Sequence, residues 1–233
     1  MIGVITLDRC IPLFEGNAAC ASTYRGSVAI RTLEGCWNPP FPPYWIDGRL
    51  SDPARQLIDT AKMLERDGVK AITCSCGLFA MTHQLFAGAV SIPVYSSSLM
   101  LIPIIRQSLP PDRVIGLVTS LPILLEAPDR VLAPIGVESL EGVETLILRN
   151  EECPMLKAAI NGKAPDASRL ALRDELLGVV ERFLSNTQGR IGALLLECSD
   201  LPPYSNDIRR MTGLPVFDFV SLIRIVESAV EIS

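Results

Sequence analysis

The chain has 233 residues, of which 48% are hydrophobic and 20% charged, and its formal net charge is −5. An acidic chain without a basic tract excludes nucleic acid or an anionic membrane as its main partner. No apolar stretch approaches the roughly 20 residues that span a bilayer, and the first residues are typical of a strand rather than a signal peptide. Seven cysteines without disulfide-scaffold spacing indicate free thiols in a reducing compartment, so we expect a cytoplasmic protein.

Short apolar runs alternate with helical patterns along the chain, which is typical of βαβ units on a parallel sheet. We expect strands at residues 2–7, 27–33, 69–74, 91–96, 113–119, 143–148, 191–197 and 214–218. We expect helices from Asp52 to Gly68, over residues 78–89, directly after Ser120, over 166–185 and over about 220–231.

Residues 8–50 depart from this alternation. They contain Pro12, Pro39, Pro40, Pro42 and Pro43 together with Trp37, Phe41, Tyr44 and Trp45. A long aromatic loop is often a lid or the wall of a binding site. A role as interface or surface cover is an equally good interpretation of this segment.

Two segments of the sequence repeat each other, and each ends in a cysteine. Residues 69–76 end at Cys76 and are followed by an Ile-Pro-Val-Tyr run; residues 191–198 end at Cys198 and are followed by Leu-Pro-Val-Phe. One offset of 122 residues superposes both features without a gap. Equivalent strand ends of two similar halves face the cleft between them, so we expect the two thiols to flank one site.

A weaker repeat and a proline pair suggest where the halves divide. Residues 2–6 resemble residues 115–119, and Pro110-Pro111-Asp112 forms a stiff connector. We therefore expect an α/β fold of two pseudo-symmetric lobes, each a mostly parallel sheet flanked by helices. The first lobe comprises residues 1–111 plus 215–233 and the second residues 112–214.

A cysteine at the carboxyl end of a parallel strand, followed by a helix, lies where ligands bind in open α/β sheets. The helix start favours the thiolate, which acts as base or nucleophile. Two opposed thiols at Cys76 and Cys198 would remove a proton from one face of a carbon acid and return one to the other. The carbanion that forms when the proton leaves needs hydrogen-bond donors nearby to stabilise it. Candidates at strand ends are Ser75, Ser97, Ser98, Thr119, Ser120 and Ser199, with capping as their alternative role.

Four segments resemble the aspartate/glutamate racemase superfamily, which includes hydantoin racemases, maleate isomerases and arylmalonate decarboxylases. They are residues 72–79, 93–99, 116–120 and 197–204. Gly16-Asn17 is similar to an early loop of an uncharacterised branch, which adds Asn17 to the substrate-binding candidates. The resemblance implies two lobes with one catalytic cysteine each, a small carboxylate substrate, no metal or pyridoxal phosphate, and a homodimer.

The sequence departs from the racemase pattern after each cysteine. Gly77-Leu78 and Ser199-Asp200 stand where glutamate racemases have Asn-Thr and Thr-His, which puts recognition of an α-amino group in doubt. Arylmalonate decarboxylases lack the first cysteine. Because both are present here, the resemblance favours two-base racemisation or isomerisation over decarboxylation.

Alternatives remain at three points. Direct alignment of the first motif selects Cys74 as catalytic thiol, whereas the repeat selects Cys76. A zinc site of Cys74, Cys76, Cys198 and His83 is the weaker interpretation, because His83 falls within a helix. The function we expect is a cofactor-independent racemase or epimerase of a small carboxylate. A maleate-type isomerase with one nucleophilic cysteine and a catalytically silent binding protein are the alternatives.

Overall fold

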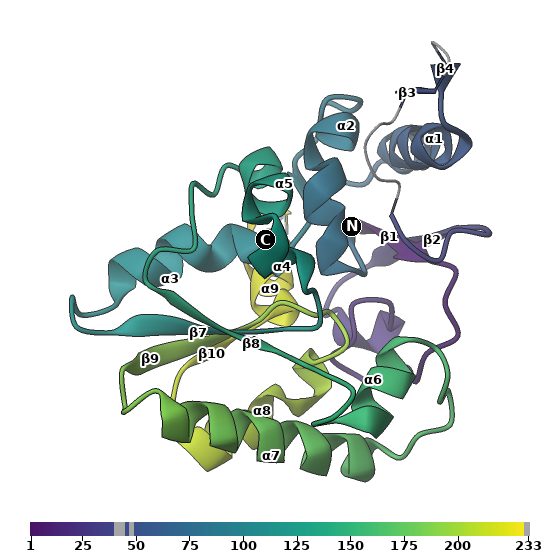
Figure 1. The fold of residues 1–233 in the computed structure, drawn as a ribbon. Helices are drawn as coiled ribbons and strands as arrows, with labels where there is room; N and C mark the ends of the chain where they lie inside the picture. The colour runs from purple at the N-terminus through teal and green to yellow at the C-terminus, as the bar shows by residue number, and fades with distance from the viewer. Residues whose placement is uncertain (40–44, 47–48, 231–233) are drawn as a thin grey trace.

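The computed structural model describes residues 1–39, 45–46 and 49–230, and two four-stranded parallel sheets form its centre (Figure 1). The first sheet has the order β2 (Val28–Leu33), β1 (Ile2–Leu7), β5 (Ile72–Cys74), β6 (Val94–Tyr95). The second has the order β10 (Val216–Phe217), β9 (Ile191–Leu196), β7 (Val114–Thr119), β8 (Val143–Ile147). The expected two-lobed α/β architecture is confirmed.

The two sheets repeat one strand order. The offset of 122 residues places β6 on β10 and the end of β5 on the end of β9, and β1 with β2 corresponds to β7 with β8. All eight expected strands are present, most of them shortened at their ends. The side chains of β1, β7 and β9 are mostly buried, as expected for strands covered on both faces, whereas those of the edge strands β2 and β8 are mostly half-buried.

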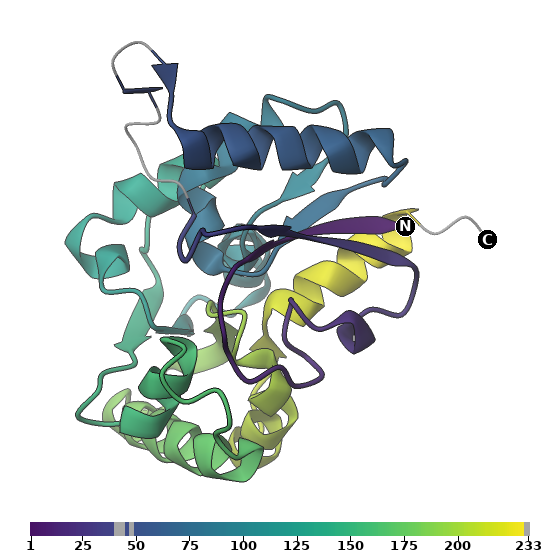
Figure 2. The ribbon, with the colours of Figure 1, turned by 90° about the vertical axis from the view of Figure 1, so that its right-hand side faces the viewer.

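Helix α1 (Asp52–Arg66) shows how the local sequence sets a helix. Pro53 lies in its first turn, where a missing N–H costs little, and Gly68 follows its end with a positive φ of 83°. Its buried side chains recur at helical spacing, including Leu57, Ala61 and Leu64. This face packs on the first sheet opposite the C-terminal helix (Figure 2).

The other α-helices are mostly short. They are α2 (His83–Ala87), α3 (Ile102–Ser108), α4 (Ile123–Glu126), α5 (Pro128–Leu132), α6 (Pro154–Ile160), α7 (Arg169–Asn186), α8 (Ser205–Thr212) and α9 (Phe219–Val230). Two of them differ from expectation. The helix expected over 78–89 is a 3₁₀ helix, η2 (Gly77–Thr82), followed by α2. The helix after Ser120 breaks at Ala127 because a residue before proline is disfavoured in helical conformation.

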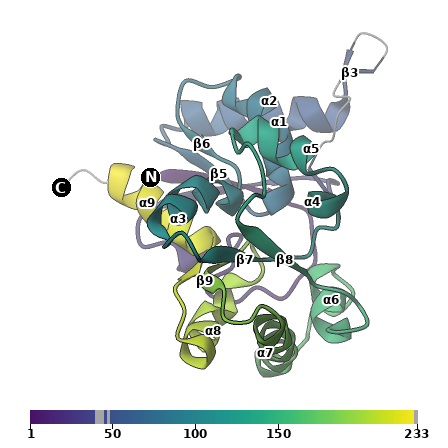
Figure 3. The same ribbon diagram turned by 60° about the vertical axis from the view of Figure 1, so that its left-hand side comes forward.

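The lobes exchange helices. Ile102 and Ile105 of α3 pack with Ile115 and Leu117 of the second sheet, although α3 follows the first sheet in the chain. Phe219 and the following turns of α9 pack against the first sheet. Figure 3 shows α3 beside β7, opposite α7 and α8.

This exchange corrects part of the expected division of the chain. We expected residues 215–233 to return to the first lobe. Strand β10 instead pairs with β9 in the second sheet, because it is the counterpart of β6, and only α9 crosses back within the described residues. Within the described residues, no helix is long and apolar enough to span a membrane.

The long aromatic segment is described in part. Trp37 and Asn38 border the cavity described below, and β3 (Trp45–Ile46) pairs with β4 (Arg49–Leu50) in antiparallel orientation. Residues 40–44 and 47–48 lie outside the described residues, so the role of the segment as a lid, or as an interface or surface cover, stays a prediction.

Candidate active site

A cavity of about 100 Å³ lies at the carboxyl ends of β5, β7 and β9 and contains both repeated cysteines. It is lined by Arg9, Trp37, Asn38, Cys76, Gly77, Leu78, Ser120, Leu121, Lys157, Ile160, Asn161, Glu197, Cys198 and Ser199. A larger cavity of about 500 Å³ borders α8 and the start of α9 and contains neither cysteine. The smaller cavity therefore contains both thiols that the repeat pairs.

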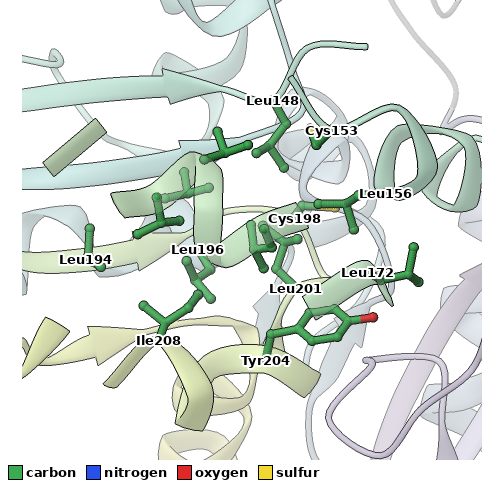
Figure 4. Close-up of a cluster of buried hydrophobic side chains, with 14 of the residues drawn as sticks. Leu148, Cys153, Leu156, Leu172, Leu194, Leu196, Cys198, Leu201, Tyr204 and Ile208 are labelled. Atoms are coloured by element: carbon green, nitrogen blue, oxygen red, sulfur yellow. The ribbon is translucent and has the colours of Figure 1, made fainter. Parts of the chain in front are cut away.

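Equivalent positions in the two lobes bring the thiols to this cavity. Cys76 lies two residues beyond the end of β5, and Cys198 lies two residues beyond the end of β9. Each precedes a turn of 3₁₀ or α-helix at the edge where parallel strands present ligand sites. Figure 4 shows Cys198 at the border of the second lobe's core, close to Leu156 and Leu201.

The structure separates the two candidates for the first thiol. Cys74 is completely buried among apolar side chains that include Ile5, Leu57 and Phe79, and it does not border the cavity. Cys76 is half-buried and lines the cavity wall. Of the two, only Cys76 is placed to meet a ligand there.

Cys198 is held next to a carboxylate. Its Sγ donates to Oδ2 of Asp200 at 3.8 Å, while Asn17 donates to Oδ1 at 2.6 Å and Arg9 to Oδ2 at 3.4 Å. Burial, followed by the negative charge of Asp200, raises the pKa of the Cys198 thiol well above its ordinary value. Cys198 is therefore a protonated thiol at neutral pH.

Cys76 has a different electrostatic environment. Burial raises the pKa of its thiol to about 12, and the next largest influence is the positive charge of Arg9, which lowers it. The carboxylates of Glu197 and Asp200 act in the raising direction. Cys76 is thus the thiol whose ionisation a neighbouring cation assists.

Glu197 has one carboxylate oxygen without a partner. Its Oε2 accepts a hydrogen bond from Thr119 Oγ1 at 2.8 Å, whereas Oε1 is buried and unpaired. Burial raises the pKa of Glu197 to about 7, and the Thr119 hydrogen bond opposes this. Oε1 lies against the α-carbon of Gly77, where any β-carbon would overlap it.

Two of the hydroxyl candidates line the cavity. Ser120 borders it, and its carbonyl accepts a hydrogen bond from Lys157 Nζ at 3.3 Å. Ser199 also borders it, and its hydroxyl donates to the carbonyl of Ser75 in the other lobe. These two serines are placed to contact a ligand.

The remaining candidates are engaged in hydrogen bonds outside the cavity lining. Ser97 caps the turn at Leu99, and Ser98 donates to the carbonyls of Leu196 and Glu197. Asn17 donates to Asp200, and Thr119 donates to Glu197. The hydroxyl of Ser75 accepts from the N–H of Leu7. The structure thus places these five around the site rather than in its wall.

Sequence reasoning missed Arg9 and Lys157. Arg9 lies two residues beyond β1, so the same strand-end argument that found the cysteines applies to it. Its guanidinium stacks on Trp37, with Cζ 5.6 Å from the ring centroid. Lys157 comes from α6, whose position over the cavity has no signal in the sequence.

His83 lies apart from these groups. Its Nδ1 is 3.0 Å from the hydroxyl of Ser96, and burial lowers the pKa of the imidazole. Among the described residues, no group of three or more histidine, cysteine or acidic side chains is arranged to hold a metal ion.

Solved structures show which fold this is. Allantoin racemase from Klebsiella pneumoniae aligns with a TM-score of 0.59 at 18% identity, covering 99% of this chain and 88% of the other. A glutamate racemase from Bacillus anthracis aligns with a TM-score of 0.58 at 16% identity, covering 98% and 80%. An arylmalonate decarboxylase variant also reaches 0.58 at 16% identity, covering 98% and 92%.

This chain has the aspartate/glutamate racemase fold. The resemblance in the sequence motifs is thereby confirmed at the level of the fold. In this racemase fold, the cavity with Cys76 and Cys198 occupies the cleft between the two sheets.

Curated relatives of this racemase-fold chain carry a different name. It is 29% identical over 230 residues to dimethylsulfoniopropionate lyase 3 of Emiliania huxleyi, covering 94% of this chain and 57% of that protein. It is 29% identical over 229 residues to dimethylsulfoniopropionate lyase of Durusdinium sp. clade D, covering 94% and 71%. The chain thus spans little more than half the length of the first of these relatives. No protein-family model matches it.

Proposed function

We propose that this protein is a cofactor-independent enzyme that removes the proton next to the carboxylate of a small acid. The observation that carries this proposal is the presence of Cys76 and Cys198 in one cavity, at equivalent strand ends of the two lobes. A thiolate is a competent base, and two thiols give the cavity a base and a proton donor.

The unequal surroundings of the thiols assign their roles. Burial keeps the Cys76 thiol protonated at rest as well, but the charge of Arg9 favours its ionised form, so we assign Cys76 as the base. Cys198, hydrogen bonded to Asp200 and held neutral by burial, is the proton donor. Arg9 and Lys157 supply positive charge for the enediolate that forms when the proton leaves.

We further propose that the reaction ends in elimination. The relatives named as dimethylsulfoniopropionate lyases match 94% of this chain, and that substrate has a sulfonium group on the carbon β to its carboxylate. Cys76 Sγ takes the α-proton, and the electron pair of that C–H bond becomes the Cα–Cβ double bond. The Cβ–S bond breaks with its electrons going to sulfur. The products are an unsaturated carboxylate and a neutral sulfide, and the proton passes from Cys76 to solvent.

Racemisation is the second candidate, because a neutral thiol at Cys198 is suited to returning a proton to the opposite face. It begins with the same proton abstraction. The two reactions differ in their need for Cys198, since a neutral sulfide leaves without being protonated. Comparing the activities of the Cys76 and Cys198 variants therefore distinguishes elimination from racemisation.

The experiment follows dimethylsulfoniopropionate and a panel of chiral small carboxylates by NMR in D₂O. For elimination we expect unsaturated acid and sulfide, a loss of at least about 100-fold in Cys76→Ser, and a smaller loss in Cys198→Ser. Cys10→Ser, at an exposed cysteine outside the cavity lining, is the matched control.

The other outcomes identify the alternatives. Deuterium at the α-carbon with loss of optical rotation, dependent on both cysteines, indicates racemisation. A covalent thiol adduct without α-exchange indicates a maleate-type isomerase, and binding without turnover a silent binding protein. Full activity in the double Cys→Ser variant overturns the use of thiols.

The expected homodimer and cytoplasmic location stay predictions. Sedimentation of the purified chain tests the dimer directly.

A further inference from the structure

Unpaired polar atoms gather at the active-site cavity. Among the described residues, three buried side-chain nitrogen or oxygen atoms have no hydrogen-bond partner: Arg9 Nε, Arg106 Nε and Glu197 Oε1. Arg9 and Glu197 both line the cavity with the thiols. A buried polar atom without a partner costs free energy, so a donor and an acceptor left open at one cavity indicate a ligand that completes both.

The unpaired acceptor at the cavity is Oε1 of Glu197. Its side chain is 1% exposed, and Thr119 satisfies only Oε2. An ionised carboxylate only accepts hydrogen bonds and carries a negative charge, so a hydrogen-bond donor or a positively charged group matches Oε1. Burial raises the pKa of Glu197, and the hydrogen bond from Thr119 and the positive charge of Lys157 offset this rise only in part.

Arg9 and Lys157 supply the hydrogen-bond donors and positive charge at the cavity. The terminal nitrogen of Arg9 donates to Asp200 and to the carbonyl of Ile160, which leaves Nε free. Lys157 donates to the Ser120 carbonyl and forms no ion pair within the described part of the chain. Its positive charge is therefore available to a carboxylate.

The charges that remain have opposite signs. Arg9 and Asp200 form an ion pair at 3.4 Å and largely offset each other. Lys157 and Glu197 are left as one positive and one negative charge on the same cavity wall. A simple anion would meet only half of this arrangement.

We propose that the cavity selects zwitterions, with the ligand carboxylate at Arg9 and Lys157 and its cationic group at Glu197. This inference rests on the proposed function and narrows its substrates to small carboxylates that bear an ammonium or sulfonium centre. Glu197 then acts as a specificity-determining residue.

The test compares two ligands of the same shape by calorimetry. β-(Trimethylammonio)propionate is a zwitterion, and β-(tert-butyl)propionate replaces its charged nitrogen by carbon. At about pH 8 we expect the wild-type protein to bind the zwitterion at least about tenfold more tightly. The preference should shrink below about pH 7, as Glu197 takes up a proton.

Glu197→Gln should abolish the preference. The affinity for β-(tert-butyl)propionate, an anion without a cationic group, should stay the same or rise, because the substitution removes a nearby negative charge. Glu126→Gln, which removes an exposed charge outside the cavity lining, should leave the preference intact. Equal affinity in the wild type, a preference that survives Glu197→Gln, or no binding of either ligand overturns the inference. The binding test does not depend on turnover, so it can fail independently of the proposed function. If the thiols exchange the α-proton of a carboxylate that has no cationic group, the proposed function stands while this inference fails.

Discussion

The carboxylate of Glu197 lies directly against the α-carbon of Gly77. A β-carbon at residue 77 would overlap Oε1 and approach Cδ to 2.6 Å. The chain has a glycine here because the glutamate needs this space, and the glycine adjoins the cavity thiol Cys76.

We expect Gly77→Ala to displace Glu197 and break its hydrogen bond to Thr119. The protein should lose about 1–3 kcal/mol of unfolding free energy, since overpacking a filled site is destabilising. Activity should fall as well, because Glu197 and Cys76 both move. Urea unfolding and rate measurements check this.

Gly178→Ala is the matched control for that substitution. Gly178 lies within α7, and a β-carbon there meets only Arg182 at an ordinary distance of 3.5 Å. It should stabilise the helix by about 0.5–1 kcal/mol. An equally mild effect at residue 77 would contradict the close contact.

The raised pKa of Glu197 makes unfolding depend on pH. Its pKa is about 7 in the folded protein against an ordinary value of 4.5, so between these values the folded state holds more protons than the unfolded state. Its contribution to stability therefore falls as pH rises from 4.5 to 7, by about 3 kcal/mol. Glu197→Gln should remove this decline. Urea unfolding of both proteins at several pH values tests it, and parallel pH curves would argue against a shifted pKa.

Burial and then the negative charge of Asp200 raise the pKa of the Cys198 thiol, so Asp200→Asn should lower that pKa. We expect Cys198 to be alkylated by iodoacetamide faster than in the wild type, by about tenfold at a given pH. Peptide mass spectrometry follows each cysteine separately. Cys153, far from Asp200 in sequence and outside the cavity lining, serves as the internal reference. An unchanged rate at Cys198 would show that burial alone sets its pKa.

Ser98 connects the lobes, because its hydroxyl donates to the carbonyls of Leu196 and Glu197 at the end of β9. Ser98→Ala leaves these buried acceptors without that donor and should cost about 1–2 kcal/mol of unfolding free energy. Ser185→Ala removes an exposed hydroxyl that bonds only within its helix and should change stability by less than about 0.5 kcal/mol. Equal effects of the two substitutions would contradict the interlobe role.

The strands were predictable because their apolar runs are bounded by turn residues and repeat at a fixed offset. The same repeat predicted that Cys76 and Cys198 share a site, and both line one cavity. The helices after Cys76 and Ser120 were less predictable. Their hydrophobic patterns suit continuous helices, but tight turns and Pro128 shorten them.

The sequence by itself determined the two-lobed parallel architecture and the pair of thiols, since strand periodicity and an ungapped repeat are local properties of the chain. Only the tertiary structure decided that Arg9, Lys157 and Glu197 meet at those thiols, that α3 and α9 exchange lobes, and that Cys74 is sealed in the core. These outcomes depend on packing between segments far apart in the chain, and no local pattern encodes which side chains such packing leaves without a partner.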